Sequence, residues 1–146
     1  MNKTPNAETT KSIITVKTTI KAPIKLIWET LTKPSHIMKW NHASPDWECP
    51  HAENDVRVGG KFVYRMSAKD KSMSFDFSGK FVKVEMGKEL SYVIDDGRAV
   101  SIILEEKGNS VDVIETFEAE NSNPKAMQQN GWQAILNSFK KHVESL

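Results

Sequence analysis

The last part of the chain, Pro124 to Leu146, reads PKAMQQNGWQAILNSFKKHVESL. Its apolar residues recur at helical spacing and form one stripe, made of Trp132, Ile135, Leu136, Phe139 and Val143. Asn123 suits the N-cap of this helix, and Pro124 suits its first position. A helix of this length is about 30 Å long and needs a broad apolar surface to lie on. We predict that a curved antiparallel sheet grips the helix, with a cavity between them.

The chain before this helix reads mostly as strands, because apolar and polar residues alternate over short runs. Pro50 in the second run indicates an edge strand or a bulge, and Asp96-Gly97 is a hairpin signal. We predict about seven strands, within Ile13–Ile20, Asp46–His51, Phe62–Met66, Ser72–Val84, Leu90–Ile94, Val100–Leu104 and Val111–Phe117.

Two short helices are predicted after the first strand. One begins at Ala22-Pro23 and ends before Pro34, and Ser35 to Trp40 forms the second helix or a tight loop. Helices segregated from strands in this way indicate an α+β fold with an antiparallel sheet. No repeat or linker divides the chain, so we expect a disordered tail over residues 1–11 and a single domain over residues 12–146.

Composition is that of an ordinary globular protein, with 146 residues, 38% hydrophobic and 27% charged. No run of residues is apolar enough to insert into a membrane, and the opening MNKTPNAETTK lacks the apolar core of a signal peptide. Cys49 is the single cysteine, so an internal disulfide is excluded. We expect a cytoplasmic protein.

Charge is balanced overall but unevenly distributed, with 20 basic and 19 acidic residues. Residues 1–40 are rich in lysine, whereas residues 85–120 are strongly acidic. No dense basic patch interleaved with aromatic residues is present, so we predict no nucleic-acid partner. The asymmetry indicates either a solvated dipolar surface or a charged docking face for a protein partner.

Several short motifs occur together in a fixed order. They are Ile20-Lys21-Ala22-Pro23 with Trp28, Leu31-Thr32-Lys33-Pro34 with Trp40, Asp55-Val56-Arg57-Val58-Gly59-Gly60-Lys61-Phe62, Gly79, and Asn130-Gly131-Trp132. In this combination the chain resembles, over about residues 12–146, the family homologous to the C-terminal domain of the activator of heat-shock protein 90 ATPase. That family belongs to the START-like helix-grip (SRPBCC) superfamily. The heat-shock activator has an additional N-terminal domain that contributes to chaperone binding, and we expect none here.

The resemblance implies a helix-grip cavity that holds a small apolar molecule such as a lipid or an aromatic compound. Without it, the aromatic residues of the strands are better explained as a packed core. The residues that we expect to bind the ligand are Trp40, Trp47, Phe62, Tyr64, Phe75, Phe77, Tyr92, Ile102, Glu115, Phe117, Trp132, Leu136 and Phe139.

Glu115 is the most informative single residue, because it is in phase with Val113 and Phe117 on the strand face assigned to the interior. A carboxyl group there would have a raised pKa and could fix a polar group of the ligand or act as a base. Tyr64 and Tyr92 are its natural hydrogen-bond partners. The alternative is a bulge that turns Ile114 inward and leaves Glu115 in solvent.

Two further hypotheses concern residues 36–51. The first is a metal site made of His42, Cys49 and His51, with His36 nearby, because Cys49 and His51 would share one strand face. The spacing of these residues matches no standard zinc pattern, so we predict no metal. His42 and Asp46 would form an acid–base pair at the cavity mouth, or Asp46 simply supports a turn at Pro45. We assign no catalytic residue and no cofactor.

Three functions compete. The leading one is a carrier or sensor of a small apolar molecule. The first alternative is a module that docks on a chaperone or another protein, and the second is a cyclase-like or hydrolase-like enzyme that uses the same cavity.

Overall fold

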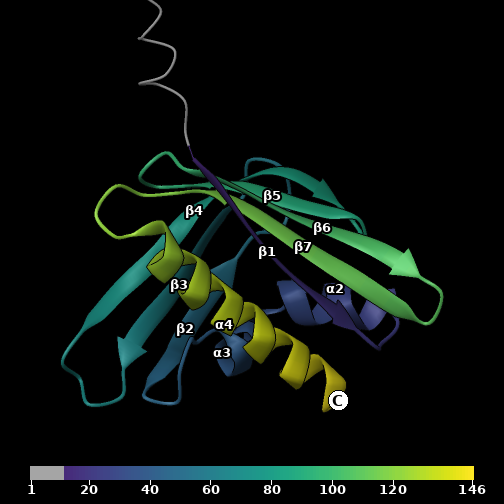
Figure 1. The fold of residues 1–146 in the computed structure, drawn as a ribbon, viewed down its shortest axis with the longest axis horizontal. Helices are drawn as coiled ribbons and strands as arrows, with labels where there is room; N and C mark the ends of the chain where they lie inside the picture. Colours follow the sequence, from purple (N-terminus) through teal and green to yellow (C-terminus); the bar gives the residue numbers. More distant parts are fainter. Residues whose placement is uncertain (1–11) are drawn as a thin grey trace, which may run out of the picture.

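The computed structural model of the protein describes residues 12–146; the tail expected over residues 1–11 lies outside this range. Within residues 12–146 the strands form one seven-stranded antiparallel sheet in the order β1-β7-β6-β5-β4-β3-β2. The sheet curls, and α4 (Lys125–Glu144) runs along the inner side of the curl (Figure 1). The strands are β1 (Ile13–Ile20), β2 (Trp47–Asn54), β3 (Lys61–Ala68), β4 (Ser74–Glu85), β5 (Glu89–Ile94), β6 (Ala99–Lys107) and β7 (Ser110–Glu118).

The helices are α2 (Ile24–Thr32) and α3 (Pro34–Trp40), which follow β1, and α4 (Lys125–Glu144), which ends the chain. The predicted helix-grip arrangement of the α+β class is therefore confirmed. None of the helices in residues 12–146 has the length and apolar character needed to span a bilayer.

The start of α4 differs from the prediction. Pro124 occupies the N-cap with extended backbone angles, and Asn123 lies outside the helix. Asn123 donates from its main-chain N–H and from its side-chain amide to the Glu120 carboxylate, at 2.6 and 3.0 Å. The side chain that was expected to cap the helix therefore braces the loop that leads into it.

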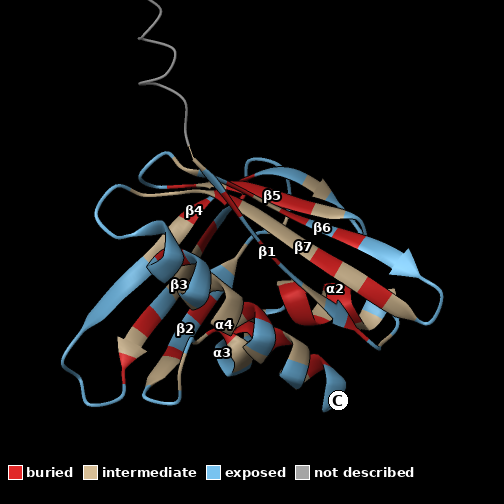
Figure 2. Cartoon of the chain, viewed as in Figure 1, coloured by how far each residue is buried: buried red, intermediate tan, exposed pale blue. Residues whose placement is uncertain are grey.

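The apolar stripe of α4 meets the sheet as predicted. Leu136, Phe139 and Val143 are buried, while Trp132 and Ile135 keep intermediate exposure. Along the strands buried positions alternate with exposed ones, which is the pattern of a sheet with one face on the core (Figure 2). One row of paired residues across this inner face is Leu90, Ile102, Glu115 and Val16.

Strand β2 is the edge of the sheet next to β3, and its pairing register shifts between Glu48 and His51. Pro50 lies in this irregular segment, where its missing N–H interrupts no ladder, as the sequence predicted. The shift has a second effect. Cys49 is buried and His51 is exposed, so the two side chains do not share a face.

Candidate functional site

A cavity of about 380 Å³ lies between the inner face of the sheet and α4. Its volume falls within the range of pockets that hold small molecules in proteins. Strands β3, β4, β5, β6 and β7 supply one wall, and the N-terminal and middle turns of α4 supply the other. Helix α2 and the end of α3 close it through Leu31, Trp40 and Asn41.

Nearly all of the residues predicted to bind a ligand stand on the wall of this cavity. They are Trp40, Phe62, Tyr64, Phe75, Phe77, Tyr92, Ile102, Glu115, Trp132, Leu136 and Phe139. They come together because positions two apart on a strand share a face and positions three or four apart on a helix share a stripe. Their role in binding stays a proposal.

Two of the predicted residues lie elsewhere. Phe117 is 1% exposed and stands behind the wall, where its ring stacks on Trp132 with centroids 3.8 Å apart and planes 12° apart. It holds the Trp132 ring in place. Trp47 packs edge-on against Phe75, with ring centroids 6.1 Å apart, in a smaller apolar cluster under α3.

The cavity wall also includes residues that the sequence analysis did not assign to ligand binding. Met127, Gly131 and Ile135 continue the helical stripe of Phe139 toward the N-terminus of α4, so helical spacing was the signal that would have found them. Arg98, Glu120 and Asn123 are polar residues from turns and loop ends, and Gln128 lies in the first turn of α4. No periodic pattern marks these four residues. The remaining wall residues are Leu31, Asn41, Met66, Phe81, Leu90 and Val113.

Glu115 faces the cavity, so the alternative that a bulge turns Ile114 inward is wrong. Pairing of β7 with β1 and with β6 is continuous through this position, opposite Val16 and Ile102. Glu115 keeps an intermediate accessible surface, which is the part of its side chain that lines the cavity. Burial among apolar neighbours raises the pKa of this carboxyl to about 8.

The expected hydrogen bonds from Tyr64 and Tyr92 to Glu115 are not present. The Tyr64 hydroxyl accepts instead from the Asn54 side-chain amide at 3.1 Å, and burial raises the pKa of Tyr64 to about 12. Tyr92 is 9% exposed, and burial followed by the nearby Glu115 charge raises its pKa well above the usual value. Glu115 thus remains a carboxyl group without a hydrogen bond within residues 12–146.

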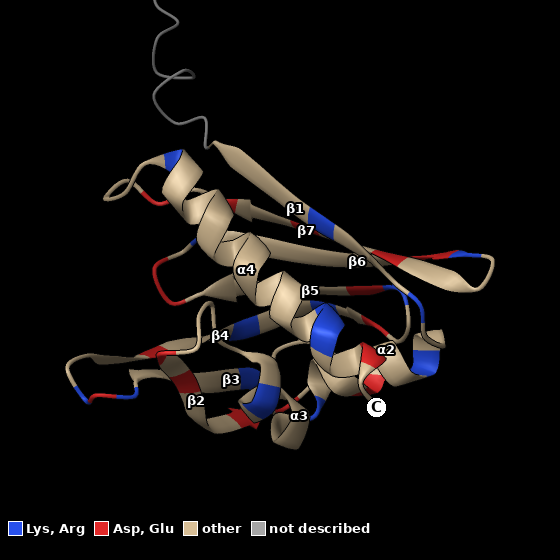
Figure 3. Cartoon of the chain, turned by 60° about the horizontal axis from the view of Figure 1, so that its bottom comes forward, with Lys and Arg blue, Asp and Glu red and all other residues tan. Residues whose placement is uncertain are grey.

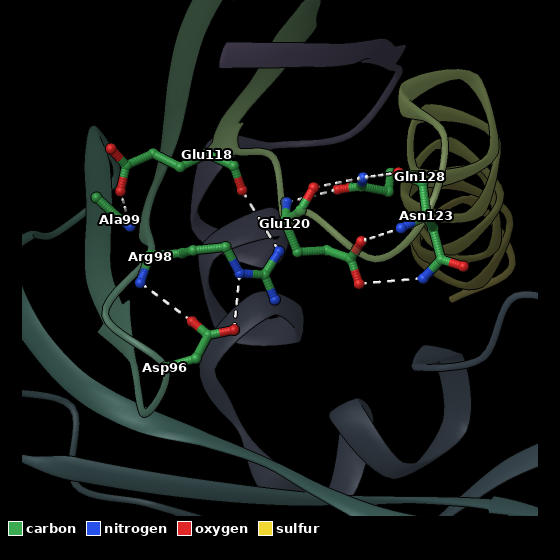
Figure 4. Close-up of polar contacts among 7 residues, drawn as sticks. All are labelled: Asp96, Arg98, Ala99, Glu118, Glu120, Asn123 and Gln128. Carbon is green, nitrogen blue, oxygen red and sulfur yellow. Dashed lines mark hydrogen bonds and ion pairs between the residues drawn. The ribbon is translucent and has the colours of Figure 1, made fainter. Parts of the chain in front are cut away.

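Polar residues gather where the turn between β5 and β6 approaches the loop that leads into α4 (Figure 4). The Arg98 guanidinium, 17% exposed, donates to the Asp96 carboxylate at 2.8 Å and to the Glu118 carbonyl oxygen at 3.4 Å. Glu120 accepts both bonds from Asn123, and Gln128 bonds the main chain of Glu120. Arg98, Glu120 and Gln128 line the cavity, so we call this cluster its mouth.

The mouth was expected instead near residues 40–47, with His42 and Asp46 as an acid–base pair. Trp40 and Asn41 do reach the cavity, but Asp46 accepts a hydrogen bond from the Ser44 hydroxyl, which is turn chemistry. Burial and the nearby Lys69 charge lower the pKa of His42. No hydrogen bond or ion pair joins His42 to Asp46 within the described residues.

The arrangement also opposes the metal hypothesis. The thiol of Cys49 is buried and faces the main-chain carbonyl oxygen of His51. The imidazole of His51 points to solvent, and its Nε2 atom lies 3.0 Å from the Glu53 carboxylate. Within residues 12–146 no three His, Cys, Asp or Glu side chains are arranged to hold a metal ion.

Comparison with known families identifies the fold family. Residues 21–144 match the model described as Activator of Hsp90 ATPase homolog 1-like protein, AHSA1. The chain belongs to this family. A comparison with functionally curated proteins found no match.

Solved structures with the AHSA1 fold agree with this assignment. An AHSA1-like protein from Aeromonas hydrophila is 42% identical, with a TM-score of 0.87 over 92% of this chain and 93% of that one. A protein from Cytophaga hutchinsonii is 47% identical, with a TM-score of 0.79 over 90% and 92% of the two chains. A protein from Nitrosomonas europaea, 19% identical, shares the fold alone, with a TM-score of 0.78 over 91% and 94% of the two chains.

One of the AHSA1-like motifs, Asn130-Gly131-Trp132, places a glycine on the cavity wall within α4. A Cβ atom at Gly131 would meet nothing within 4 Å, so neither the sheet nor another side chain requires glycine there. Replacing Gly131 with alanine should therefore stabilise the protein by up to about 1 kcal/mol, through the higher helix propensity of alanine.

Urea unfolding of Gly131→Ala and of Ala134→Gly, the reverse change one turn along α4, will measure this. The two variants should shift the unfolding midpoint in opposite directions. A loss of stability in Gly131→Ala would mean that the helix backbone is approached more closely than the cavity geometry indicates.

Proposed function

We propose that the protein binds a small, largely apolar molecule in the cavity between the sheet and α4, and carries or senses it. The observation that supports this most directly is the cavity itself. It has a volume of about 380 Å³, aromatic walls and a polar mouth, and it lies where a single long helix covers the sheet. Interiors normally pack without voids of this size, so a space kept open by bulky rings indicates a ligand.

Native and denaturing mass spectrometry of the protein as purified from cells will test this proposal. A ligand should appear as an added mass under native conditions, and the denatured sample should release it for identification. A protein that is consistently empty, and that also binds none of a panel of small aromatic compounds, would contradict the proposal.

Trp132 is the residue whose replacement should most affect binding. Its ring lines the cavity and is held by stacking on Phe117 and by edge contact with Phe77, at centroid distances of 3.8 and 6.0 Å. Trp132→Gln removes this wall and places an amide in the apolar space. We expect the affinity for 2-naphthol to fall at least about tenfold, because burying an aromatic ring is worth a few kcal/mol. Binding is measured by the fluorescence of 2-naphthol.

Trp47→Gln is the matched control, because Trp47 lies outside the cavity. Both variants must keep a cooperative thermal transition. Equal affinity of Trp132→Gln and the wild type, in folded protein, would refute the role of this wall.

A chaperone-associated role is the second candidate, since the matching family is described as Activator of Hsp90 ATPase homolog 1-like protein. Acidic residues lie along the turn between β5 and β6 and in the loop before α4 (Figure 3), and such a face suits a basic docking partner. A complex with a chaperone that weakens as salt rises would support this role.

The single cysteine is consistent with the cytoplasmic location that we propose.

A further inference from the structure

Two polar groups on the cavity wall have no hydrogen-bond partner within residues 12–146. They are the carboxyl group of Glu115 and the hydroxyl group of Tyr92. The two lie near enough for the charge of one to affect the other. Buried polar groups almost always have partners, and an unsatisfied one is costly. An occupant that meets both groups would remove this cost.

The surroundings of Glu115 favour a positive charge in the occupant. Phe62, Phe77, Tyr92 and Trp132 turn aromatic rings onto the same cavity, and the faces of such rings attract cations. A cation in this space would have a carboxylate as counter-ion and aromatic rings around it.

The charge at the mouth points the same way. The cluster in Figure 4 contains three acidic side chains, Asp96, Glu118 and Glu120, and one basic side chain, Arg98. Asp96 pairs with Arg98 at 2.8 Å and offsets its charge. The excess of carboxylates raises the local concentration of cations and repels anions.

We propose that the ligand is a compact apolar molecule with one amine group, whose ammonium donates to Glu115 and Tyr92 inside the aromatic walls. This inference rests on the function proposed above and adds the chemical class of the ligand. The cavity has room for about a dozen water-sized groups at about 30 Å³ each, so an aromatic ring with a short aminoalkyl chain fits.

The ionisation of Glu115 gives the proposal a measurable signature. With a pKa of about 8 the carboxyl of the empty protein is mostly protonated at pH 6 to 7. Pairing with an ammonium requires the carboxylate, so binding releases the Glu115 proton to solvent. Affinity for the amine should therefore rise with pH, by up to about tenfold per unit between pH 6 and 8, and level off above.

Burial raises the pKa values of the two tyrosines on the cavity wall, Tyr64 and Tyr92, so these phenols stay neutral over this pH range. Glu120 at the mouth is a carboxyl group that accepts two hydrogen bonds. The residues that line the cavity from α2, α3, α4 and β6 do not ionise, and Val16, the row neighbour of Glu115 on β1, does not either.

Isothermal titration calorimetry with three compounds of one shape tests the proposal. They are 2-phenylethylamine, 2-phenylethanol and phenylacetate, titrated into the ligand-free protein at pH 6, 7 and 8. We expect the amine to bind at least about tenfold tighter than the alcohol at pH 8, and phenylacetate to bind weakest. In Glu115→Gln the preference for the amine and its pH dependence should both disappear. Glu105→Gln, at an exposed position of β6, should retain both.

The other outcomes are decisive too. Equal binding of amine and alcohol, or tighter binding of phenylacetate, would overturn the amine assignment and leave the apolar-ligand function standing. An amine preference that survives in Glu115→Gln would overturn the role of Glu115. If none of the three compounds binds at millimolar concentration, the assignment fails and the proposed function loses support with it.

Discussion

Glu115→Gln is expected to be more stable than the wild type at pH 8 and to lose this advantage near pH 4.5. The pKa of Glu115 is about 8 in the folded protein, against an ordinary value of 4.5. At pH values between 4.5 and 8, the unfolded chain releases the Glu115 proton, whereas the folded protein keeps it. Folding stability contributed by this group is therefore fully present below pH 4.5 and is lost as pH rises toward 8. Glutamine does not ionise, so the variant does not suffer this loss.

The size of the effect follows from the shift. Each pKa unit is worth about 1.4 kcal/mol, which gives an upper limit of about 5 kcal/mol. Solvent that enters the cavity lowers the penalty for the charge. We therefore expect the stability difference between Glu115→Gln and the wild type to change by about 2 to 3 kcal/mol between pH 4.5 and 8.

Guanidinium chloride unfolding of both proteins, freed of ligand by unfolding and refolding, will measure this difference. Glu105→Gln is the control, since its carboxyl is exposed and its removal should leave the pH profile of stability unchanged. Parallel profiles for Glu115→Gln and the wild type would show that Glu115 titrates as a solvated carboxyl.

The main elements of this fold were predictable because the apolar residues of each element recur at a regular spacing. The stripe from Trp132 to Val143 marks α4, and alternation marks β6 and β7 without reference to the rest of the chain. The pairing register of β6 with β7 is continuous, so inward-facing and outward-facing residues alternate regularly along these two strands. It is for this reason that most of the predicted wall residues meet at one cavity.

The remaining features depend on bulges, register shifts and turns, which the spacing of apolar residues in the sequence does not indicate. Glu115 faces inward only because β7 has no bulge, whereas the shift in β2 separates Cys49 from His51. Arg98 reaches the cavity from a hairpin turn, and its position depends on the bend of that turn and on its bond to Asp96. Side chains of this kind are placed by tertiary contacts, so the sequence analysis did not include this polar cluster in the site.

Gly60→Ala is expected to be the most destabilising of the single-residue changes considered, at about 3 kcal/mol or more. A Cβ atom at Gly60 would overlap the carbonyl oxygen of Asp55 and come within 3.0 Å of that of Arg57. Both are main-chain atoms of the same turn, in which Gly60 donates to the Arg57 carbonyl at 2.8 Å. Relief would require this turn to open, and the turn also anchors Phe81 through hydrogen bonds of 2.8 and 2.9 Å to Gly59 and Gly60. Overpacking against backbone that cannot move is costly.

Gly59→Ala separates this steric effect from backbone strain at the neighbouring residue. Gly59 has φ of +86° but nothing within 4 Å of a Cβ atom, so alanine there costs only the left-handed conformation, about 1 to 2 kcal/mol. Urea unfolding should rank the wild type above Gly59→Ala, and Gly59→Ala above Gly60→Ala. The Phe81 ring lines the cavity, so ligand affinity should fall in Gly60→Ala as well. Equal stability of the two variants would mean that the turn relaxes freely and does not hold β4 against β3.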